Sequence, residues 1–336
     1  MVDPHSSSVC LVTGANGYIG SHVCAALLES RYEVIALDNG EQFDTWFDFP
    51  LPRKLSAIVK GDCGDQILLR EVFSEHNISH VIHCAGLKNV GESWIESSRY
   101  WRTNVSSTIA LAEISMEFDV HRFVFSSSCS VYGDIGDVAA DESCDLKPLS
   151  PYARTKESAE RAIADIFRGT SSAVVSLRYF NAVGVDEFYG RDEGVHSLNL
   201  IPRTVSAALR VGPPVSVFGD DFDTPDGSCI RDYIDVRDIA RAHVMGLEAE
   251  LGSAQSVFNL GSGIGSSVFE VLSAVERSSG LSVPRTLEPR RPGDPGSVKA
   301  SSSEAMRTLG WTPLVSLEES IESVVARAKR SWVVGR

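Results

Sequence analysis

Residues 9–20 read VCLVTGANGYIG, and this short stretch decides the fold of the chain. Its apolar start predicts a buried strand, and the segment that follows predicts a helix over Gly20–Ser30. Glycines at positions 14, 17 and 20 let the backbone turn sharply and approach a pyrophosphate, which would rest on the N–H groups at the start of the helix. This order of strand, glycines and helix predicts a dinucleotide-binding site.

The next predicted strand ends in an acidic residue, Asp38, 18 residues after Gly20. A carboxylate at this place accepts hydrogen bonds from the adenosine ribose and repels a 2′-phosphate. No Arg or Lys follows Asp38 until Arg53, so we expect NAD rather than NADP. A glycine-rich turn beside a solvated aspartate is the alternative interpretation.

The stretch SPYARTK places Tyr152 and Lys156 four residues apart at the start of a predicted helix, on one face. A neighbouring ammonium lowers the pKa of a phenol, which is otherwise about 10. A predicted strand leads into Ser128, whose hydroxyl could bond the same substrate oxygen. The three side chains predict proton removal from an alcohol while hydride leaves for NAD. A Tyr–Lys pair on a helix surface is the alternative.

Apolar β-branched runs alternate with amphipathic segments through the first half of the chain, which is typical of a parallel sheet with helices on both faces. We predict an α/β fold, a Rossmann-like doubly wound parallel sheet with a smaller C-terminal α/β substrate-binding lobe. The NAD-binding domain is placed at residues 1–180 and the second lobe at residues 181–336, with some chain crossing back. The predicted strands are Val9–Thr13, Glu33–Leu37, Ala57–Val59, His80–Cys84, Phe123–Ser126 and Ala173–Arg178, and a further strand is expected in PVSVF. The other predicted helices are Gln66–His76, Asn104–Phe118, Tyr152–Phe167, Val236–Glu250, Val268–Ser279 and Leu317–Arg330.

Composition excludes several classes of function. The net charge of −14 repels nucleic acid. No apolar run approaches the ~18–20 residues that span a bilayer, and the N-terminal MVDPHSSSV does not resemble a signal peptide, so we expect no membrane association and a cytoplasmic protein. The seven cysteines are scattered, and His80 and His83 would point to opposite faces of a strand, so we expect reduced thiols and no metal site.

A series of motifs in order along the chain resembles the extended short-chain dehydrogenase/reductases, most closely the UDP-glucose 4-epimerase family. The motifs are TGANGYIGSH, LDN, HCAGLKNVGES, SSSCSVYGD, SPYARTK, LRYFNAVG, FGDDFDTPDGSCIRDYIDV, FNLGSG and PRRPGD. The resemblance implies an NAD-dependent isomerase that interconverts UDP-glucose and UDP-galactose through a 4-keto sugar. Tyr152 would remove the proton of the sugar 4-hydroxyl, Lys156 would tune Tyr152 and hold the nicotinamide ribose, and Ser128 would position the 4-oxygen.

The same matching implies two groups of ligand contacts. The positions that match NAD contacts are Gly14, Gly17, Tyr18, Ile19, Gly20, Asp38, Asn39, Asp62, Cys63, Cys84, Ala85, Gly86, Lys88, Asn104, Ser128, Tyr152, Lys156 and Phe180. Those that match nucleotide-sugar contacts are Ser128, Tyr152, Asn181, Asn199, Phe218, Arg231, Arg291, Asp294 and Val298. The two arginines suit a UDP pyrophosphate, which favours paired charged donors; solvated surface arginines are the alternative.

The resemblance also bears on substrate range. In the family, the residue four after the Asp of RRPGD lines the pocket around the sugar 2-substituent, and a Tyr there confines relatives to UDP-glucose and UDP-galactose. Val298 takes that place here, so we expect room for UDP-N-acetylglucosamine and UDP-N-acetylgalactosamine as well. A one-residue shift in the alignment would put Ser297 or Lys299 there instead.

A homodimer is also implied, with Asn104–Phe118 and Tyr152–Phe167 pairing across a two-fold axis. Ile109, Ala110, Ala159 and Ile163 would supply its apolar contacts, unless they face the sheet.

Two segments depart from the family pattern, GEQFDTWFDFP after Asn39 and AVGVDEFYGRDEGVHSLN after Asn181, and Asp235 stands where many relatives have His. Nucleotide-sugar dehydratases and decarboxylases of the same fold carry an acid just after the catalytic Ser or Thr, where Cys129 and Ser130 stand here. A GDP-fucose-synthase-like enzyme would need Cys at position 130. A non-catalytic NAD-binding sensor would not need the Ser, Tyr and Lys set, which argues against it.

Overall fold

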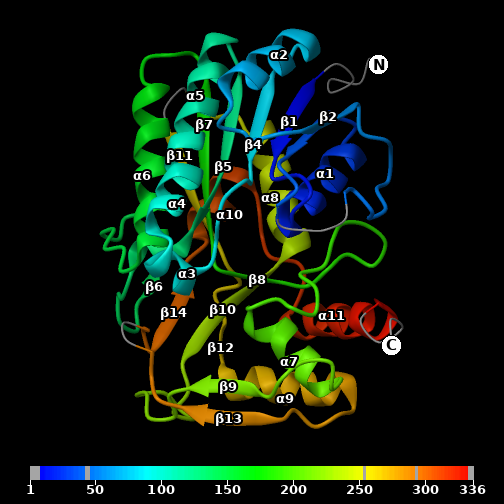
Figure 1. The fold of residues 1–336 in the computed structure, drawn as a ribbon. Coiled ribbons are helices and arrows are strands. Elements are labelled where there is room, and N and C mark those ends of the chain that lie inside the picture. Colours follow the sequence, from blue (N-terminus) through cyan, green and yellow to red (C-terminus); the bar gives the residue numbers. More distant parts are fainter. Residues whose placement is uncertain (1–7, 42–45, 253–254, 292–293, 332–336) are drawn as a thin grey trace.

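A seven-stranded parallel sheet forms the centre of the larger lobe (Figure 1). The computed structural model describes residues 8–41, 46–252, 255–291 and 294–331. The sheet order is β11-β7-β5-β4-β1-β2-β3, so the chain runs outward from β1 in one direction and then in the other. The strands are β1 (Val9–Thr13), β2 (Glu33–Asp38), β3 (Ala57–Lys60), β4 (His80–His83), β5 (Arg122–Ser128), β7 (Ala173–Tyr179) and β11 (Gln255–Leu260).

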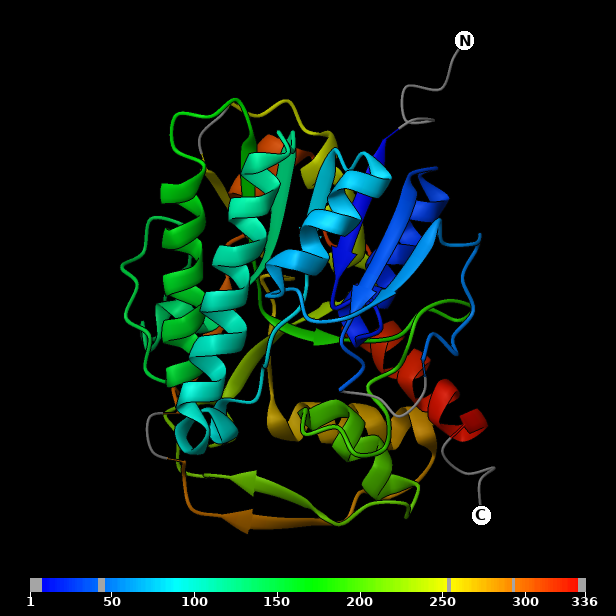
Figure 2. The same ribbon diagram turned by 45° about the horizontal axis from the view of Figure 1, so that its top comes forward.

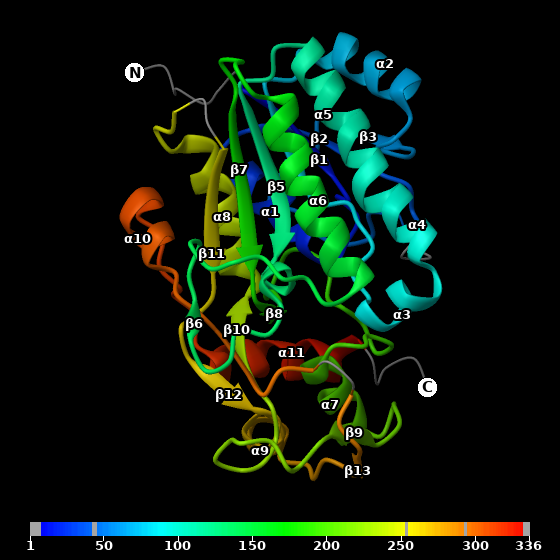
Figure 3. The same cartoon turned by 90° about the vertical axis from the view of Figure 1, so that its left-hand side faces the viewer.

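Helices cover both faces of this sheet (Figure 3). Alternate residues of β1 show why: Cys10 and Val12 lie in one apolar cluster, and Leu11 lies in the other. The first cluster is completed by α1 (Tyr18–Glu29), α8 (Val236–Glu248) and α10 (Ser303–Leu309), and the second by α2 (Gln66–His76), α5 (Ser107–Glu117) and α6 (Pro151–Ile166). Figure 2 shows α5 and α6 packed side by side over the sheet.

The second lobe is built on smaller sheets below the carboxyl ends of the parallel strands (Figure 1). One has the order β12-β10-β14-β6 with β8 beside β10, and the other pairs β13 with β9. Its strands are β6 (Ala139–Ala140), β8 (Asn181–Val183), β9 (Val215–Phe218), β10 (Ile230–Asp235), β12 (Gly265–Ser267), β13 (Arg285–Glu288) and β14 (Ser297–Ala300). Helices α7 (Leu200–Ala208), α9 (Val268–Ser279) and α11 (Leu317–Ser331) enclose its core.

The predicted fold class is confirmed, and six predicted strands are present with ends shifted by at most two residues. Helix α1 begins at Tyr18 rather than Gly20, because Gly17 takes the extended capping conformation. The predicted helix Asn104–Phe118 begins instead in a π-helical turn, Arg102–Ser106, which runs into α5 and follows the short helices α3 (Val90–Ile95) and α4 (Ser97–Trp101). The division at residue 180 stays a prediction, and the segments that cross back are α8, β11 and α10.

One expectation about helix faces is wrong. Ala159 and Ile163 are completely buried in this chain's own core against the sheet, and Ala110 is also buried. These three therefore have no surface to offer a second subunit, whereas Ile109, the fourth residue of that expectation, is only partly buried. Residues 1–7, on which the signal-peptide expectation rests, lie outside the described residues. Within the described ranges, no helix is both long and apolar enough to cross a bilayer.

Candidate active site

The glycine-rich segment from β1 into α1 has no room for a side chain at Gly14 or Gly20. Gly14 has a φ of +66°, and a Cβ there would lie 2.7 Å from the backbone nitrogen of Ala85. A Cβ on Gly20 would lie 2.1 Å from the carbonyl oxygen of Gly14. Gly17 precedes the first turn of α1, so the loop presents backbone and a helix N-terminus. This cradle fits a dinucleotide pyrophosphate.

Asp38 ends β2 beside this loop, and its side chain is buried. Its Oδ2 accepts a hydrogen bond from the Asn16 N–H at 3.0 Å, and its Oδ1 accepts one from Gly40 at 2.8 Å. The carboxylate is thereby fixed next to the glycine-rich loop. The neighbouring candidates differ, since Asn39 and Asp62 are exposed and hold their own turns, whereas Cys63 is buried.

Ser128, Tyr152 and Lys156 come together where β5 ends and α6 begins. Ser150 caps α6 by accepting a hydrogen bond from the Ala153 N–H at 3.1 Å, which fixes the turn that carries Tyr152. All three side chains are nearly buried, and Ser128 is hydrogen-bonded to Tyr152. The sequence spacing predicted this grouping.

The electrostatics of the three groups depend on burial. Loss of solvent raises the pKa of Tyr152 to about 12, and the hydrogen bond with Ser128 opposes that rise. Burial lowers the pKa of Lys156 to about 8, because an ammonium is poorly solvated there. The Lys156 Nζ donates a hydrogen bond to the carbonyl oxygen of Ser126 at 2.9 Å and lies 4.8 Å from the centroid of the Phe125 ring. Both contacts hold the ammonium against β5.

The loop after β4 meets the same group of residues. A Cβ on Gly86 would lie 3.2 Å from the Asn104 Oδ1 and 3.4 Å from the Lys156 Nζ. The Asn104 amide accepts from the Leu87 N–H at 2.8 Å and donates to the Thr155 hydroxyl at 3.0 Å. Asn104 thus holds this loop against α6. Asn104 itself lies in the π-helical turn Arg102–Ser106. Cys84, just before this loop, accepts a hydrogen bond from the Ser126 hydroxyl at 3.2 Å.

The predicted sugar-nucleotide contacts gather in the second lobe. Arg231 on β10 forms an ion pair with Asp294 at 2.5 Å, and the Arg291 guanidinium lies 3.7 Å from the centroid of the Phe218 ring. Val298 is the register partner of Arg231. It packs against a buried cluster that contains Phe180, and Cys129, the residue after Ser128, packs against the same cluster. Asn181 lies exposed on β8.

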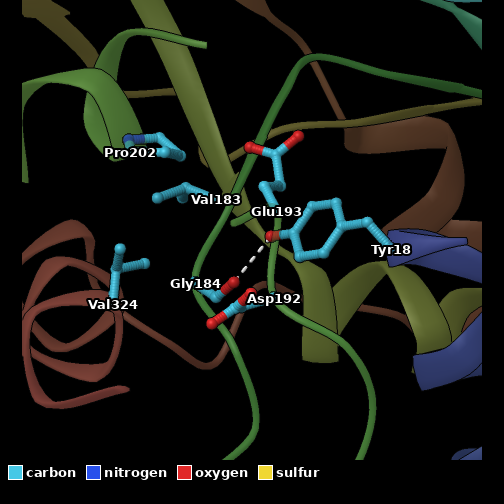
Figure 4. Close-up of a pocket in the computed structure, with 7 residues that line it drawn as sticks. All are labelled: Tyr18, Val183, Gly184, Asp192, Glu193, Pro202 and Val324. Carbon is cyan, nitrogen blue, oxygen red and sulfur yellow. Dashed lines mark hydrogen bonds between the residues drawn. The ribbon is translucent and has the colours of Figure 1, made fainter. Parts of the chain in front are cut away.

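Glu193 is a site residue that sequence reasoning missed. Its buried carboxylate accepts hydrogen bonds from the Lys88 Nζ at 2.5 Å and from the Asn199 Nδ2 at 2.6 Å. It thus joins a predicted NAD contact to a predicted sugar contact. The Lys88 Nζ also lies 5.8 Å from the centroid of the Tyr18 ring. Figure 4 shows Glu193 beside Tyr18 in a small pocket that is lined also by Val183, Gly184, Asp192, Pro202 and Val324. No motif in the sequence marks Glu193, because the charge that it pairs with, Lys88, is distant along the chain.

The histidines considered as a metal cluster lie apart. His83 is buried, with its two ring nitrogens 2.6 Å from the Thr13 hydroxyl and 2.8 Å from the Thr108 hydroxyl. His80 bonds instead to Ser79, and His76 lies at the end of α2. Among the described residues, no three His, Cys, Asp or Glu side chains are grouped as metal ligands would be.

The chain matches a family of known proteins. Residues 10–261 match the model of the NAD dependent epimerase/dehydratase family. The chain belongs to this family. The family resemblance expected from the motifs is therefore confirmed.

Individual members of the epimerase/dehydratase family match almost end to end. The UDP-glucose 4-epimerase of Neisseria meningitidis serogroup C is 40% identical over 326 residues, which is 93% of this chain and 94% of the relative. The structure of UDP-glucose 4-epimerase from Bifidobacterium longum in complex with NAD+ and UDP has a TM-score of 0.88 at 34% identity, covering 96% of this chain and 99% of that one. The structure of the UDP-Glc/GlcNAc 4-epimerase of Campylobacter jejuni has a TM-score of 0.83 at 30% identity. It covers 96% of this chain and 99% of that one.

Proposed function

We propose that this epimerase/dehydratase interconverts UDP-glucose and UDP-galactose, with NAD as its cofactor. The observation that carries the proposal is the grouping of Ser128, Tyr152 and Lys156 next to the glycine-rich cradle. The relatives named UDP-glucose 4-epimerase, which match over nearly the whole chain, support the same reaction. The positions after Ser128 are Cys129 and Ser130, so the acid that an elimination would need is absent from them.

In this proposal, Tyr152 takes the proton of the sugar 4-hydroxyl and returns it to the 4-oxygen at the end. Ser128 holds that oxygen, and the Lys156 ammonium, on the same helix face, would oppose the rise in the pKa of Tyr152 that burial causes. Bound NAD supplies the acceptor, and then the donor, of the hydride on C4. The 4-keto sugar must present both of its faces before the proton returns, so the pocket has to admit two orientations of the ring.

We assign NAD to residues 1–180 together with the returning segments α8, β11 and α10. The sugar nucleotide is assigned to the rest of residues 181–336. The Gly14 and Gly20 cradle and the buried Asp38 support the cofactor assignment. Arg231 and Arg291 support the second, because guanidinium groups suit a pyrophosphate.

The test is direct. Purified protein supplied with NAD and UDP-galactose should produce UDP-glucose, scored by chromatography, and should run the reverse reaction as well. The absence of product from protein with bound NAD would rule the proposal out. A 4-keto-6-deoxy sugar or released CO2 would identify a dehydratase or a decarboxylase instead.

We further propose that the sugar pocket admits a 2-N-acetyl group. Val298 and Ala300 share one face of β14 and pack with the cluster around Phe180. Lys299 points to the other face, toward Gly265, which favours Val298 over Lys299 as the residue beside the sugar. The Campylobacter jejuni relative, named for UDP-Glc and GlcNAc, supports a wider pocket in this family.

Val298→Tyr should abolish conversion of UDP-N-acetylglucosamine and spare UDP-glucose, because the phenol would occupy the space of the acetyl group. Lys299→Tyr, on the opposite face, is the matched control. A parent inactive on the N-acetyl pair, or a Tyr variant with unchanged preference, would contradict the proposal.

We propose a homodimer formed by the outer faces of α3, α4 and α5, in place of the buried residues first expected. Trp94, Ile95 and Trp101 are 59%, 82% and 41% exposed, and Met116 on α5 is 40% exposed. Apolar surface of this extent on neighbouring helices favours an interface. Light scattering at micromolar concentration should give twice the chain mass of 36.4 kDa. A mass of one chain would contradict it.

We also propose a cytoplasmic location for the enzyme. All seven cysteines are free thiols, which suits a reducing compartment. Fractionation of the source cells should recover the protein with the cytoplasmic fraction.

A further inference from the structure

The two segments that depart from the family pattern lie against each other. Residues 46–50 belong to the first, which Leu51 follows, and residues 184–191 belong to the second. The Gly190 N–H donates a hydrogen bond to the Pro50 carbonyl at 3.3 Å, and Arg191 forms an ion pair with Asp48. The Arg191 guanidinium also lies 5.2 Å from the centroid of the Phe49 ring.

The second segment is attached along the first turns of α1. The Tyr18 hydroxyl donates to the Gly184 carbonyl at 2.6 Å, a bond drawn in Figure 4. The Asp186 N–H donates to the His22 Nε2 at 3.2 Å, and the Arg191 N–H donates to the Ser21 hydroxyl at 2.9 Å. These bonds bring the Arg191 side chain to the N-terminal end of α1, where the glycine-rich loop lies.

Both segments donate hydrogen bonds to one residue of that loop, Asn16. Its Oδ1 accepts hydrogen bonds from the Arg191 Nη2 at 3.1 Å and from the Phe47 N–H at 3.0 Å. Its own N–H donates to the Asp38 Oδ2 at 3.0 Å. The contact between the two segments is therefore anchored on the residue that also holds the ribose-binding carboxylate.

We propose that Arg191 and Asp48 close a clasp over the adenosine end of the NAD site, so that Arg191 is a positioning residue that retains the cofactor. The clasp consists of Asn16, residues 46–51 and residues 184–191. It rests on the proposed function, because it needs NAD in the glycine-rich loop. The Arg191 side chain is 11% exposed, so water competes weakly for its bonds with Asp48 and Asn16. NAD can leave from this end only when those bonds open.

The clasp is tested on the holoenzyme. Parent, Asp48→Asn, Arg191→Gln and the double variant are loaded with radiolabelled NAD and chased with excess unlabelled NAD, and retained label is followed by rapid gel filtration. Each single variant should release NAD roughly 10- to 100-fold faster than the parent, as expected for loss of a charge-assisted hydrogen bond. The double variant should be no faster than the faster single variant, because both changes open one contact. Activity lost with the NAD should return when NAD is added to saturation.

Arg168→Gln is the matched control, because it breaks an exposed ion pair with Asp165 at the far end of α6. Its release rate should equal that of the parent. The Asp48 side chain is 48% exposed, so Asp48→Asn tests the clasp without leaving an unpaired polar group in the protein core. Release within twofold of the parent for Asp48→Asn and Arg191→Gln, or additive effects in the double variant, would overturn the clasp alone. A parent that never holds labelled NAD would overturn the proposed function and the clasp with it.

Discussion

The phenol of Tyr152 is the single group on which the proposed chemistry depends. Tyr152→Phe keeps the ring that packs edge-on against Tyr100, with centroids 6.5 Å apart, and removes only the hydroxyl. The variant should fold and retain NAD, and its kcat should fall by about 10²–10⁴-fold, the usual contribution of a positioned acid–base group. Steady-state rates with UDP-galactose check this. Activity within a few-fold of the parent would exclude Tyr152 as the base.

A second prediction for a single residue concerns Gly14. Gly14→Ala would combine a positive φ with a Cβ 2.7 Å from the Ala85 nitrogen, whereas Gly136 has a similar φ of +68° and nothing within 4 Å. Gly14→Ala should therefore lower the free energy of unfolding by about 1–3 kcal/mol more than Gly136→Ala. It should also lower NAD retention. Denaturant titration compares the two variants, and equal losses would show that the close approach to Ala85 is unimportant.

Sequence reasoning reached the residues whose relation is local. Tyr152 and Lys156 share a helix face because of their spacing, and Ser128 joins them because a strand of a parallel sheet ends there. Glu193 and Arg191 could not be found in this way. Their partners lie on other segments, and only tertiary packing decides which charges meet.

Among the elements, β5, β7 and α6 are held together by a buried ion pair below the catalytic residues. The Arg178 Nη2 lies 2.6 Å from the Glu160 Oε2, both side chains are at most 6% exposed, and the Ser127 hydroxyl also donates to Glu160. Glu160→Leu leaves a buried charge without its partner and should cost about 3–5 kcal/mol. Glu160→Leu with Arg178→Met should recover most of that loss. Denaturant titration decides, and a cost below about 1 kcal/mol for the single variant would show that water reaches Arg178.

Elements with their own periodicity were predicted closely, as α2 and α9 show. The pairing of two strands could not be predicted when the strands lie far apart in the sequence. Strand β11 pairs with β7 although a large part of the second lobe lies between them. The π-helical turn before α5 was missed as well, because the helical periodicity of the sequence hardly changes there. In the structure, this turn brings Asn104 into contact with Leu87 and Thr155.

For the whole molecule, three buried histidines predict sensitivity to acid. Burial lowers the pKa of His22 to about 4, of His83 to about 3 and of His243 to about 4, from the usual 6.5. The unfolded chain therefore binds more protons than the folded one below about pH 6.5, so stability falls as the pH drops toward 4.

His243→Gln should make that fall shallower by up to ~1.4 kcal/mol per pH unit. Unfolding free energies at several pH values between 6.5 and 4.5 measure the slope. His196→Gln, at an exposed position, is the control that should leave the slope unchanged. An unchanged slope for His243→Gln would mean that His243 is charged in the folded protein.

Val298 of the second lobe and Cys129, the residue after Ser128, pack against the same buried cluster. In the proposed mechanism, the C4 hydrogen leaves the sugar as hydride and returns to the same carbon. The most direct test uses UDP-galactose with deuterium at C4, incubated with the enzyme in ordinary water until the two sugars equilibrate. Mass spectrometry should find the deuterium retained at C4 in both UDP-glucose and UDP-galactose. Replacement of that deuterium by solvent hydrogen during interconversion, or no interconversion by protein with bound NAD, would contradict the mechanism.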